Sequence, residues 1–351
     1  MNRSARVIRF HKTGGPEVLK LEDIVLPEPR GREVLVRVLA IGLSRLDALW
    51  REGVFFEEPA LPAGIGYCAA GVVEGVGAEV ANIKVGDHVS TLPAVSLLDY
   101  TAHGEIILYP ENALFVYPKN VSCNQAVASS SGLFAAYFAL LELARLQPDQ
   151  YVVITAASSS MGVAAIQVAK TIGAKPIAVT RSELKIEQLT AVGADHVIIA
   201  GLDDVQETIL DLTGDDGADV IYDGVAGPGL EELVWATRKF GHVIVYGYLG
   251  AMDEMTPLPL GASFLRGLNL HASYKIFDFT GHPRLGIPRQ RGVLKRAKRF
   301  VFDGLEAGKF VPRIDRVFNG LDQYVAAHQY LGTNAQTGKI LVSLEDPPLV
   351  R

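Results

Sequence analysis

Apolar strand-length segments alternate with helix-length segments through the middle of this chain, and that alternation constrains the fold more than any other feature. The apolar segments are rich in β-branched residues and are predicted strands, whereas the amphipathic segments between them are predicted helices. The predicted strands are 151–155, 176–180, 196–199, 219–222 and 242–246. The predicted helices are 162–172, 182–192, 205–212 and 231–240. Alternation at this spacing indicates an α/β domain of the Rossmann type, which is a doubly wound parallel sheet.

The segments on either side of this region are rich in short strands and glycine turns, as small β domains are. A short helical stretch over 46–51 and a basic helix after residue 265 interrupt them. Their predicted strands are 34–41, 70–80, 85–89 and 339–344. We therefore predict a Rossmann domain over 124–266, inserted into a β-rich domain that is split between 1–123 and 267–351.

Length, composition and charge exclude several classes of function. The chain has 351 residues, of which 49% are hydrophobic and 21% charged, so it can form two cores. Its formal net charge of −6 argues against a nucleic-acid partner, because phosphate binding requires a basic surface. The stretch 284–299 is a local exception with seven basic residues and no acid. Such a stretch is either a solvated helix face beside a loop or an anion-binding patch.

Cysteine content and hydropathy predict a cytoplasmic protein with no membrane partner. Cys68 and Cys123 are the only cysteines, which indicates a reducing compartment rather than a disulfide framework. The N-terminal residues 1–12 are charged and lack the apolar core of a signal peptide. The most apolar run, 126–141, contains several serines and is shorter than the roughly 18 apolar residues that a membrane span needs.

The turn after the first predicted strand of the Rossmann domain has the position of a phosphate-binding loop. Free N–H groups and the helix dipole at the following helix N-terminus favour an anion there. Glycines usually form such a turn, but this one reads AASSSMG over 156–162 and retains only its last glycine. Serine hydroxyls can bind a phosphate or a free N–H, although a plain strand–helix turn is the alternative. The candidate dinucleotide-binding residues are Ser158, Ser159, Ser160, Met161 and Gly162.

The end of the second predicted strand indicates which dinucleotide is bound. An acidic residue there suits the free 2′-hydroxyl of the adenosine ribose, whereas basic residues suit a 2′-phosphate. Here the strand ends in Thr180, Arg181 and Ser182, and Lys185 lies one turn into the next helix. Glu183, the nearest acid, comes too late to occupy the strand end. These residues predict NADPH rather than NADH, with ordinary surface charges as the alternative.

Several short motifs, taken in their order along the chain, carry a resemblance to a known family. They are GGPEVL at 14–19, GLSRLD at 42–47, GYCAAGVVEGVG at 66–77, VGDHV at 85–89, AASSSMG at 156–162, GADHV at 193–197, DGVAG at 223–227 and GKI at 338–340. Together they resemble the medium-chain dehydrogenase/reductase superfamily, specifically its zinc-independent, quinone oxidoreductase-like branch. The resemblance covers essentially the whole chain. It implies that the split β-rich domain is GroES-like and binds the substrate, while the Rossmann domain binds the cofactor.

The resemblance also implies an enzyme without zinc. Zinc-dependent members place a Cys, a His and a Cys or Asp on the catalytic metal, and this chain has Ser44, Tyr67 and Ser131 at those positions. None of the three side chains is a suitable ligand for a tetrahedral zinc site. Two cysteines also cannot supply the four-cysteine structural zinc lobe.

Without a metal to polarise it, the acceptor of a hydride from NADPH must already be electrophilic, as quinones, α,β-unsaturated carbonyl compounds and enoyl thioesters are. The resemblance places this small hydrophobic molecule in a cleft between the domains. Tyr67 would bind its carbonyl oxygen and stabilise the enolate, or would only fill the vacated metal position. Ser44 would be a polar contact near the nicotinamide. Trp50, Phe55 and Phe56 would form an apolar wall.

The resemblance places the nicotinamide end of the cofactor at the ends of the fourth and fifth predicted strands. Backbone groups there hold the carboxamide in family members, and the corresponding residues are Val225, Gly247 and Tyr248. The segment 258–274 follows at the edge of the sheet and predicts a homodimer that forms through paired sheets.

The leading hypothesis is therefore a zinc-independent, NADPH-dependent oxidoreductase of quinones or activated alkenes. A non-catalytic NADPH-binding protein is one alternative, and turnover distinguishes the two. An enoyl-thioester reductase is the other. Phe55 disfavours it, because related enoyl reductases carry a catalytic tyrosine at this position.

Overall fold

The computed structural model describes residues 3–250, 256–257 and 259–345, and the chain divides into two compact units. Unit 1 comprises Met1–Ser131, Phe279–Gln290 and Val311–Arg351, and unit 2 comprises Gly132–Asp278 and Arg291–Phe310. The predicted boundaries were 123/124 and 266/267. The observed boundaries lie later in the chain, at 131/132 and 278/279. Residues 291–310 also belong to unit 2. Helix α2 (Cys123–Ser129) lies in unit 1 because it packs on strands of that unit.

Unit 2 is built on a six-stranded sheet in which every pairing is parallel. In spatial order its strands are β11 (His196–Ile199), β10 (Lys175–Thr180), β9 (Tyr151–Ile154), β12 (Ala218–Asp223), β13 (Thr237–Val245) and β14 (Asn269–His271). The strand order reverses between β9 and β12. Parallel sheets of this kind bind ligands at the carboxyl ends of the strands beside such a switch point. The predicted doubly wound sheet is confirmed.

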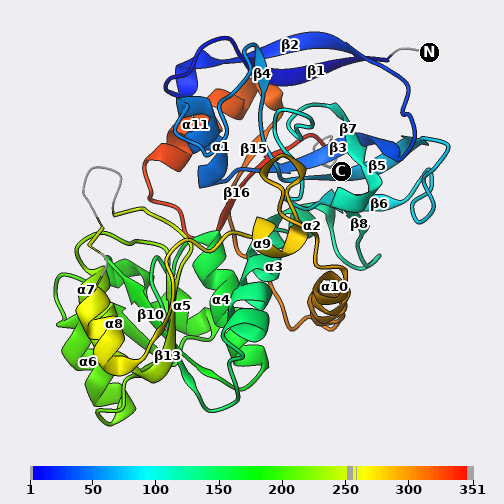
Figure 1. Ribbon diagram of the computed structural model, residues 1–351. Coiled ribbons are helices and arrows are strands. Elements are labelled where there is room, and N and C mark those ends of the chain that lie inside the picture. Colours follow the sequence, from blue (N-terminus) through cyan, green and yellow to red (C-terminus); the bar gives the residue numbers. More distant parts are fainter. Residues whose placement is uncertain (1–2, 251–255, 258, 346–351) are drawn as a thin grey trace, which may run out of the picture. The chain divides into compact units, whose positions relative to one another are not determined.

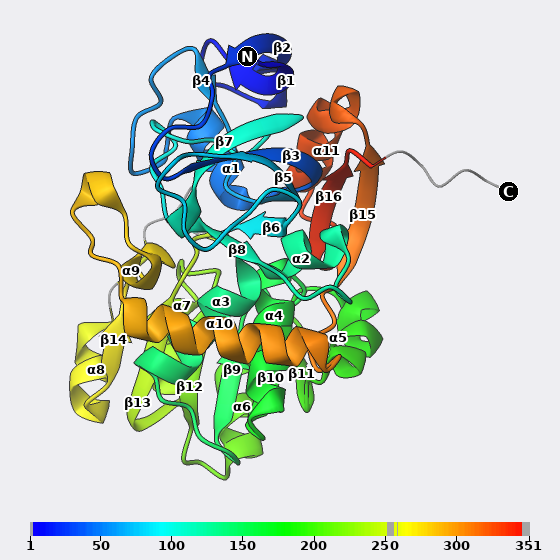
Figure 2. The same cartoon turned by 90° about the vertical axis from the view of Figure 1, so that its right-hand side faces the viewer.

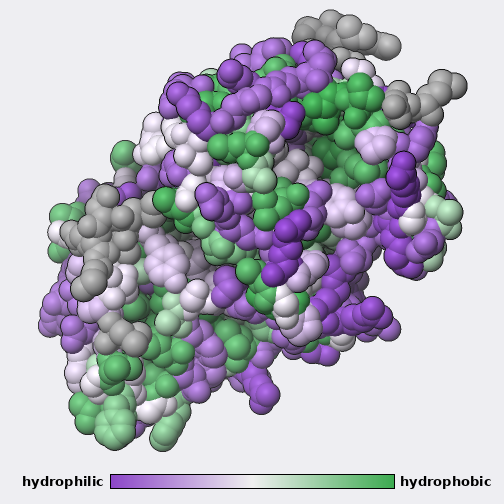
Figure 3. Space-filling view, turned by 45° about the horizontal axis from the view of Figure 1, so that its top comes forward, coloured by the Kyte–Doolittle hydropathy of each residue, from purple (hydrophilic) through white to green (hydrophobic). Residues whose placement is uncertain are grey.

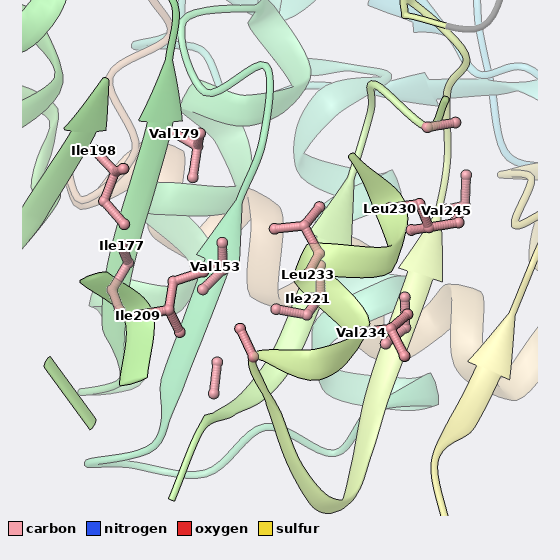
Figure 4. Close-up of a cluster of buried hydrophobic side chains, with 14 of the residues drawn as sticks. Val153, Ile177, Val179, Ile198, Ile209, Ile221, Leu230, Leu233, Val234 and Val245 are labelled. Atoms are coloured by element: carbon pink, nitrogen blue, oxygen red, sulfur yellow. The ribbon is translucent and has the colours of Figure 1, made fainter. Parts of the chain in front are cut away.

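Helices cover both faces of this sheet. They are α3 (Gly132–Tyr137), α4 (Ser160–Thr171), α5 (Ile186–Val192), α6 (Val205–Thr213), α7 (Leu230–Trp235), α8 (Leu260–Arg266) and α10 (Arg291–Glu306). Figure 2 shows α3, α4 and α10 over one face. Side chains of α6 and α7 pack on the other face against Val153, Ile221 and Val245 of the sheet (Figure 4). Ala262 of α8 belongs to the same buried cluster. Strands buried on both faces explain the nearly continuous apolar runs in the sequence.

The predicted helix over 231–240 is wrong in its last part. Helix α7 ends at Trp235, and β13 begins at Thr237, five residues before the predicted strand. The first part of β13 is irregular, because its register with β12 shifts between Thr237 and His242, and two residues define this irregularity. Phe240 has a φ of +63°, and a Cβ on Gly241 would lie 2.9 Å from a backbone oxygen of β12. The first residues of β13 are therefore irregular and closely packed. The apolar residues of 231–240 have helical spacing, which is why the sequence predicted a helix there.

One other predicted helix begins differently. The segment predicted over 182–192 starts as a 3-10 turn, η4 (Glu183–Lys185), before α5. In the basic stretch 284–299, α10 begins at Arg291 and follows a loop, which agrees with a helix face beside a loop. Three of its arginines form ion pairs, Arg284 with Asp99 at 2.6 Å, Arg296 with Glu142 at 2.7 Å and Arg299 with Asp303 at 3.6 Å.

Unit 1 contains a seven-stranded and a three-stranded sheet, whose strands are drawn in Figure 1. The larger sheet runs β15 (Ile314–Asn319), β16 (Lys339–Ser343), β3 (Glu33–Gly42), β5 (Ala69–Val76), β6 (His88–Thr91) and β8 (Leu114–Val116), with β7 (Ile106–Pro110) paired to β3. The smaller sheet runs β2 (Leu19–Leu26), β1 (Arg3–Phe10) and β4 (Ala63–Gly64). Besides α2, the α-helices wholly within unit 1 are α1 (Arg45–Glu52) and α11 (Tyr324–Gly332).

One helical run among the described residues, Cys123–Leu143, is long and apolar enough to cross a membrane. It consists of α2, α3 and a π-helical turn over Phe138–Leu143, and it is longer than the run that the sequence analysis considered. However, 78% of its most apolar window is buried inside the protein. Core packing accounts for its apolar composition.

Candidate cofactor and acceptor sites

The serine turn of unit 2 joins β9 to the N-terminus of α4, and the helix start is held by Ser159. The Ser159 hydroxyl accepts a hydrogen bond from the N–H of Gly162 at 3.0 Å, which satisfies one of the free N–H groups of the first turn. Ser158, Ser159, Ser160 and Met161 are each half-buried and so accessible to a ligand. A twelve-residue helix with accessible N–H groups can bind a phosphate group.

Gly162 is the one residue of the turn that must be glycine. A Cβ there would lie 2.5 Å from the carbonyl oxygen of Ala157 and 2.6 Å from its Cα. Both atoms belong to the backbone, so no side-chain movement can make room. The helix thus starts in direct contact with the turn, as the packing glycine of a dinucleotide-binding fold requires.

Lys185, which follows β10, links the region after this strand to the serine turn. Its ammonium group donates a hydrogen bond to the Ser158 hydroxyl at 3.0 Å. Thr180 is buried, whereas Arg181 is exposed and Ser182 half-buried. The basic residues predicted to bind a 2′-phosphate therefore lie at the strand end, and Lys185 is also in contact with the predicted phosphate loop.

The turn after β12 is held by a buried carboxylate that sequence analysis did not single out. Asp223 is fully buried and accepts hydrogen bonds from the Thr155 hydroxyl and from the N–H of Ala226 at 2.8 Å. Burial raises the pKa of Asp223, and these hydrogen bonds oppose the shift. The N–H of Val225 also donates to Asp223, at 3.1 Å. The predicted nicotinamide segment is thereby fixed to the end of β9.

Two residues that follow β13 were predicted to contact the cofactor. Gly247 passes the preceding turn closely, since a Cβ on it would lie 2.8 Å from the carbonyl oxygen of Gly224. Tyr248 is 45% exposed, and its hydroxyl donates to the carbonyl oxygen of Ala272 at 3.1 Å. The preceding residue, Tyr246, contacts the turn after β9, since its hydroxyl donates to the carbonyl oxygen of Thr155 at 3.4 Å. The sequence places Tyr246 at the end of the strand but does not show this contact.

Unit 1 brings together the three positions that hold zinc in related enzymes. The Asp47 carboxylate accepts the N–H of Ser44 at 2.7 Å and also the backbone N–H of Tyr67. Ser131 hydrogen bonds to the thiol of Cys68. Burial raises the pKa of Asp47 to about 6, although the nearby ammonium of Lys339 lowers it. Asp47 is therefore the side chain that organises this cluster, and sequence analysis identified it only as part of a motif.

At these positions Tyr67 is buried, and Ser44 and Ser131 are half-buried. Ser44 caps α1, and Tyr67 is fully buried. Burial raises the pKa of Tyr67 well above its usual value, so its phenol stays protonated and can donate a hydrogen bond. Among the described residues, no group of three or more His, Cys, Asp or Glu side chains could hold a metal ion.

The predicted aromatic wall divides into buried and exposed residues. Trp50 is fully buried and donates to the carbonyl oxygen of Gly64 at 2.9 Å, so it belongs to the core. Phe55 lies between Trp50 and Tyr67, with ring centroids 6.1 and 6.4 Å away. Phe56 is 43% exposed. The ring of Phe55 is thus the immediate apolar neighbour of Tyr67 in this part of unit 1.

Comparison with known proteins gives the family. Residues 30–143 match the family described as alcohol dehydrogenase GroES-like domain, and residues 160–276 match the family described as zinc-binding dehydrogenase. The quinone oxidoreductase of Salmonella typhimurium is 32% identical over 344 residues, which cover 95% of this chain and 98% of that protein. The chain belongs to the medium-chain dehydrogenase/reductase superfamily and is quinone oxidoreductase-like. The resemblance noted in the sequence is confirmed.

Further relatives and solved structures of this superfamily agree. A 2-haloacrylate reductase of a Burkholderia species is 28% identical and covers 95% of this chain and 97% of that protein. The crystal structure of Escherichia coli quinone oxidoreductase complexed with NADPH aligns with a TM-score of 0.84 at 26% identity, covering 97% of this chain and 100% of that one. As a member of this superfamily, the protein is an oxidoreductase with a nicotinamide cofactor.

Proposed function

We propose that this protein is an NADPH-dependent, zinc-independent reductase of quinones or α,β-unsaturated carbonyl compounds, and that it acts in the cytoplasm. The observation that carries the cofactor choice is the basic strand end of β10. Lys185 contacts the serine turn at 3.0 Å, Arg181 is exposed beside it, and no acid occupies that strand end. A guanidinium and an ammonium group suit a 2′-phosphate.

In this proposal the bound nicotinamide supplies the hydride, and the residues of the chain bind, orient and protonate. The first turn of α4, with Ser158 and Ser159, binds the pyrophosphate. The Asp223 network fixes the turn at Val225 against which the nicotinamide end is oriented. Tyr67, whose phenol is protonated, donates a hydrogen bond to the acceptor's carbonyl oxygen as negative charge develops there.

A panel assay tests the reaction class. Purified protein is mixed with NADPH or NADH and with quinones, enones and an enoyl thioester, and loss of reduced nucleotide is followed. We expect turnover with NADPH and with a quinone or an enone. Nucleotide binding without turnover of any acceptor would instead indicate a non-catalytic protein.

Replacing Tyr67 with phenylalanine tests the proposed donor. Tyr67→Phe should lower kcat for an enone about 100-fold, because one hydrogen-bond donor to a developing oxyanion contributes that much. The KM for NADPH should not change. Tyr109→Phe is the matched control, since Tyr109 is equally buried and is not proposed to act. An unchanged kcat in Tyr67→Phe would assign Tyr67 to packing.

We also propose that the protein forms a homodimer through the β14 edge of unit 2. Of the predicted segment 258–274, Leu258 lies outside the described residues. Helix α8 in this segment exposes Phe264 by 86% and Leu265 by 68%. Figure 3 shows apolar atoms gathered on the side of unit 2 that carries α8. An open strand edge beside an apolar surface is suited to pairing with a second copy.

Phe264→Asp should convert a dimer to a monomer in light scattering after size exclusion, because a buried unpaired carboxylate opposes association. Leu202→Asp is the control, since Leu202 is 70% exposed and lies elsewhere in unit 2. A monomeric wild-type protein at micromolar concentration would contradict the proposal.

A further inference from the structure

Tyr246 lies beside the predicted phosphate loop, although it is not part of the glycine fingerprint that usually forms such a loop. It follows β13 directly, and its N–H donates to the carbonyl oxygen of Asp223 at 2.8 Å. Its ring stacks on that of the fully buried Tyr222, with centroids 4.1 Å apart and planes at 21°. The backbone hydrogen bond to Asp223 and the stacked ring of Tyr222 together fix the ring of Tyr246, and so they fix the position of its hydroxyl.

That hydroxyl faces the loop. It donates a long hydrogen bond, 3.4 Å, to the carbonyl oxygen of Thr155, the residue at which β9 leads into the turn. The Ser159 side chain, which caps α4, also hydrogen bonds to this phenol and lowers its pKa. Burial acts more strongly and raises the pKa of Tyr246, so the phenol is protonated and donates. One hydroxyl thus reaches both the start of the turn and its helix cap.

Space for this hydroxyl is provided by Gly224, which directly follows the neighbouring strand β12. A Cβ on Gly224 would lie 2.5 Å from the Tyr246 hydroxyl oxygen and 2.6 Å from the ring carbon that bears it. Where the usual fingerprint has glycines, the turn after β9 has Ala156 and three serines, and it keeps only its last glycine. Ala156 now has a φ of +47°, a conformation that a non-glycine residue adopts at some cost. Such a turn needs support from its surroundings.

We propose that Tyr246 is a positioning residue of the cofactor site, whose hydroxyl holds the serine turn in the shape that binds the pyrophosphate. In this role a side chain from β13 does what glycines do in the usual fingerprint. The inference rests on the proposed nucleotide site, but it concerns the pyrophosphate, which NADPH and NADH share. It is therefore independent of the 2′-phosphate selectivity proposed for Arg181 and Lys185.

Tyr246→Phe is the decisive variant because it removes the hydroxyl and keeps the stacked ring. We expect the Kd values for NADPH and NADH, measured by nucleotide fluorescence, to rise by the same factor of about five to ten, which is what one hydrogen bond of about 1 kcal/mol accounts for. The kcat at saturating NADPH and the melting temperature of the free protein should stay close to wild type. Tyr137→Phe is the matched control, since it removes a hydroxyl that hydrogen bonds to Glu142 elsewhere in unit 2.

Unchanged Kd values for both nucleotides in Tyr246→Phe would overturn the proposal, and so would a rise for NADPH alone, which would mean contact with the 2′-phosphate. A second test combines Tyr246→Phe with Ser159→Ala. If the two hydroxyls act on one turn, the rise in Kd in the double variant should be smaller than the product of the two single rises. Independent, multiplying effects would contradict the role. A wild-type protein that binds neither nucleotide refutes the proposed function itself.

Discussion

Replacing Arg181 and Lys185 together with alanine is expected to raise the Kd for NADPH about 100-fold and to leave the Kd for NADH within about threefold. Hydrogen bonds to charged groups contribute about 1.5–3 kcal/mol each. Arg181 is exposed, so solvent screening reduces its share. A total near 2.7 kcal/mol corresponds to the 100-fold change. NADH lacks the 2′-phosphate that these two side chains are proposed to bind, and so loses little.

Fluorescence titration with both nucleotides measures this selectivity. Lys170→Ala is a suitable control, because it removes one positive charge from the opposite end of α4, where Lys170 pairs with Asp195 at 2.6 Å. The ratio of the two Kd values should not change in that variant. Equal weakening of NADPH and NADH in the double variant would show that the two residues do not recognise the 2′-phosphate.

Gly162→Ala is expected to weaken binding of both nucleotides at least 100-fold and to destabilise unit 2 by about 2 kcal/mol. A methyl group there would meet three backbone atoms of the turn at 2.5 to 2.7 Å, so the turn itself must move. Overpacking of this kind typically costs about 1–3 kcal/mol. The N–H groups that bind phosphate belong to the same turn, so their geometry is lost with it.

Thermal unfolding and nucleotide titration measure the two effects of Gly162→Ala. Gly292→Ala provides the comparison, since it adds the same methyl group near the start of α10, where the nearest atom would be 3.9 Å away. That control should retain binding and gain slightly in stability, because alanine favours helix more than glycine does. Normal NADPH affinity in Gly162→Ala would show that the turn does not bind the cofactor.

Strands β9, β10 and β12 of unit 2 were predictable because they are buried on both faces. The predicted strand 196–199 matches β11, and the predicted starts of the β9, β10 and β12 strands lie within one residue of the observed ones. Burial demands apolar residues throughout such strands, and this pattern is visible in a single sequence. The start of β13 was not visible. Its first residues include the irregular backbone at Phe240, and this irregularity depends on close contact with β12.

The candidate site was predictable only where one segment carries its chemistry. Ser159 and Gly162 belong to a single turn, and the sequence shows their order. The roles of Tyr246 and Asp223 were not predicted, because they arise from neighbours that are distant in sequence, such as Thr155. No spacing rule links these three residues along the chain. Burial of Tyr67 was likewise invisible, since a tyrosine serves equally well in a core or at a site.

The sequence by itself determined that this chain has a parallel sheet and a strand that ends in a basic residue, and it predicted an anion-binding turn before the following helix. These are properties of local composition and order, which need no knowledge of distant contacts. The tertiary structure decided that Lys185 meets Ser158, that Asp223 ties two strand ends together, and that the Tyr246 hydroxyl lies over the serine turn. Only folding brings such groups within hydrogen-bonding distance.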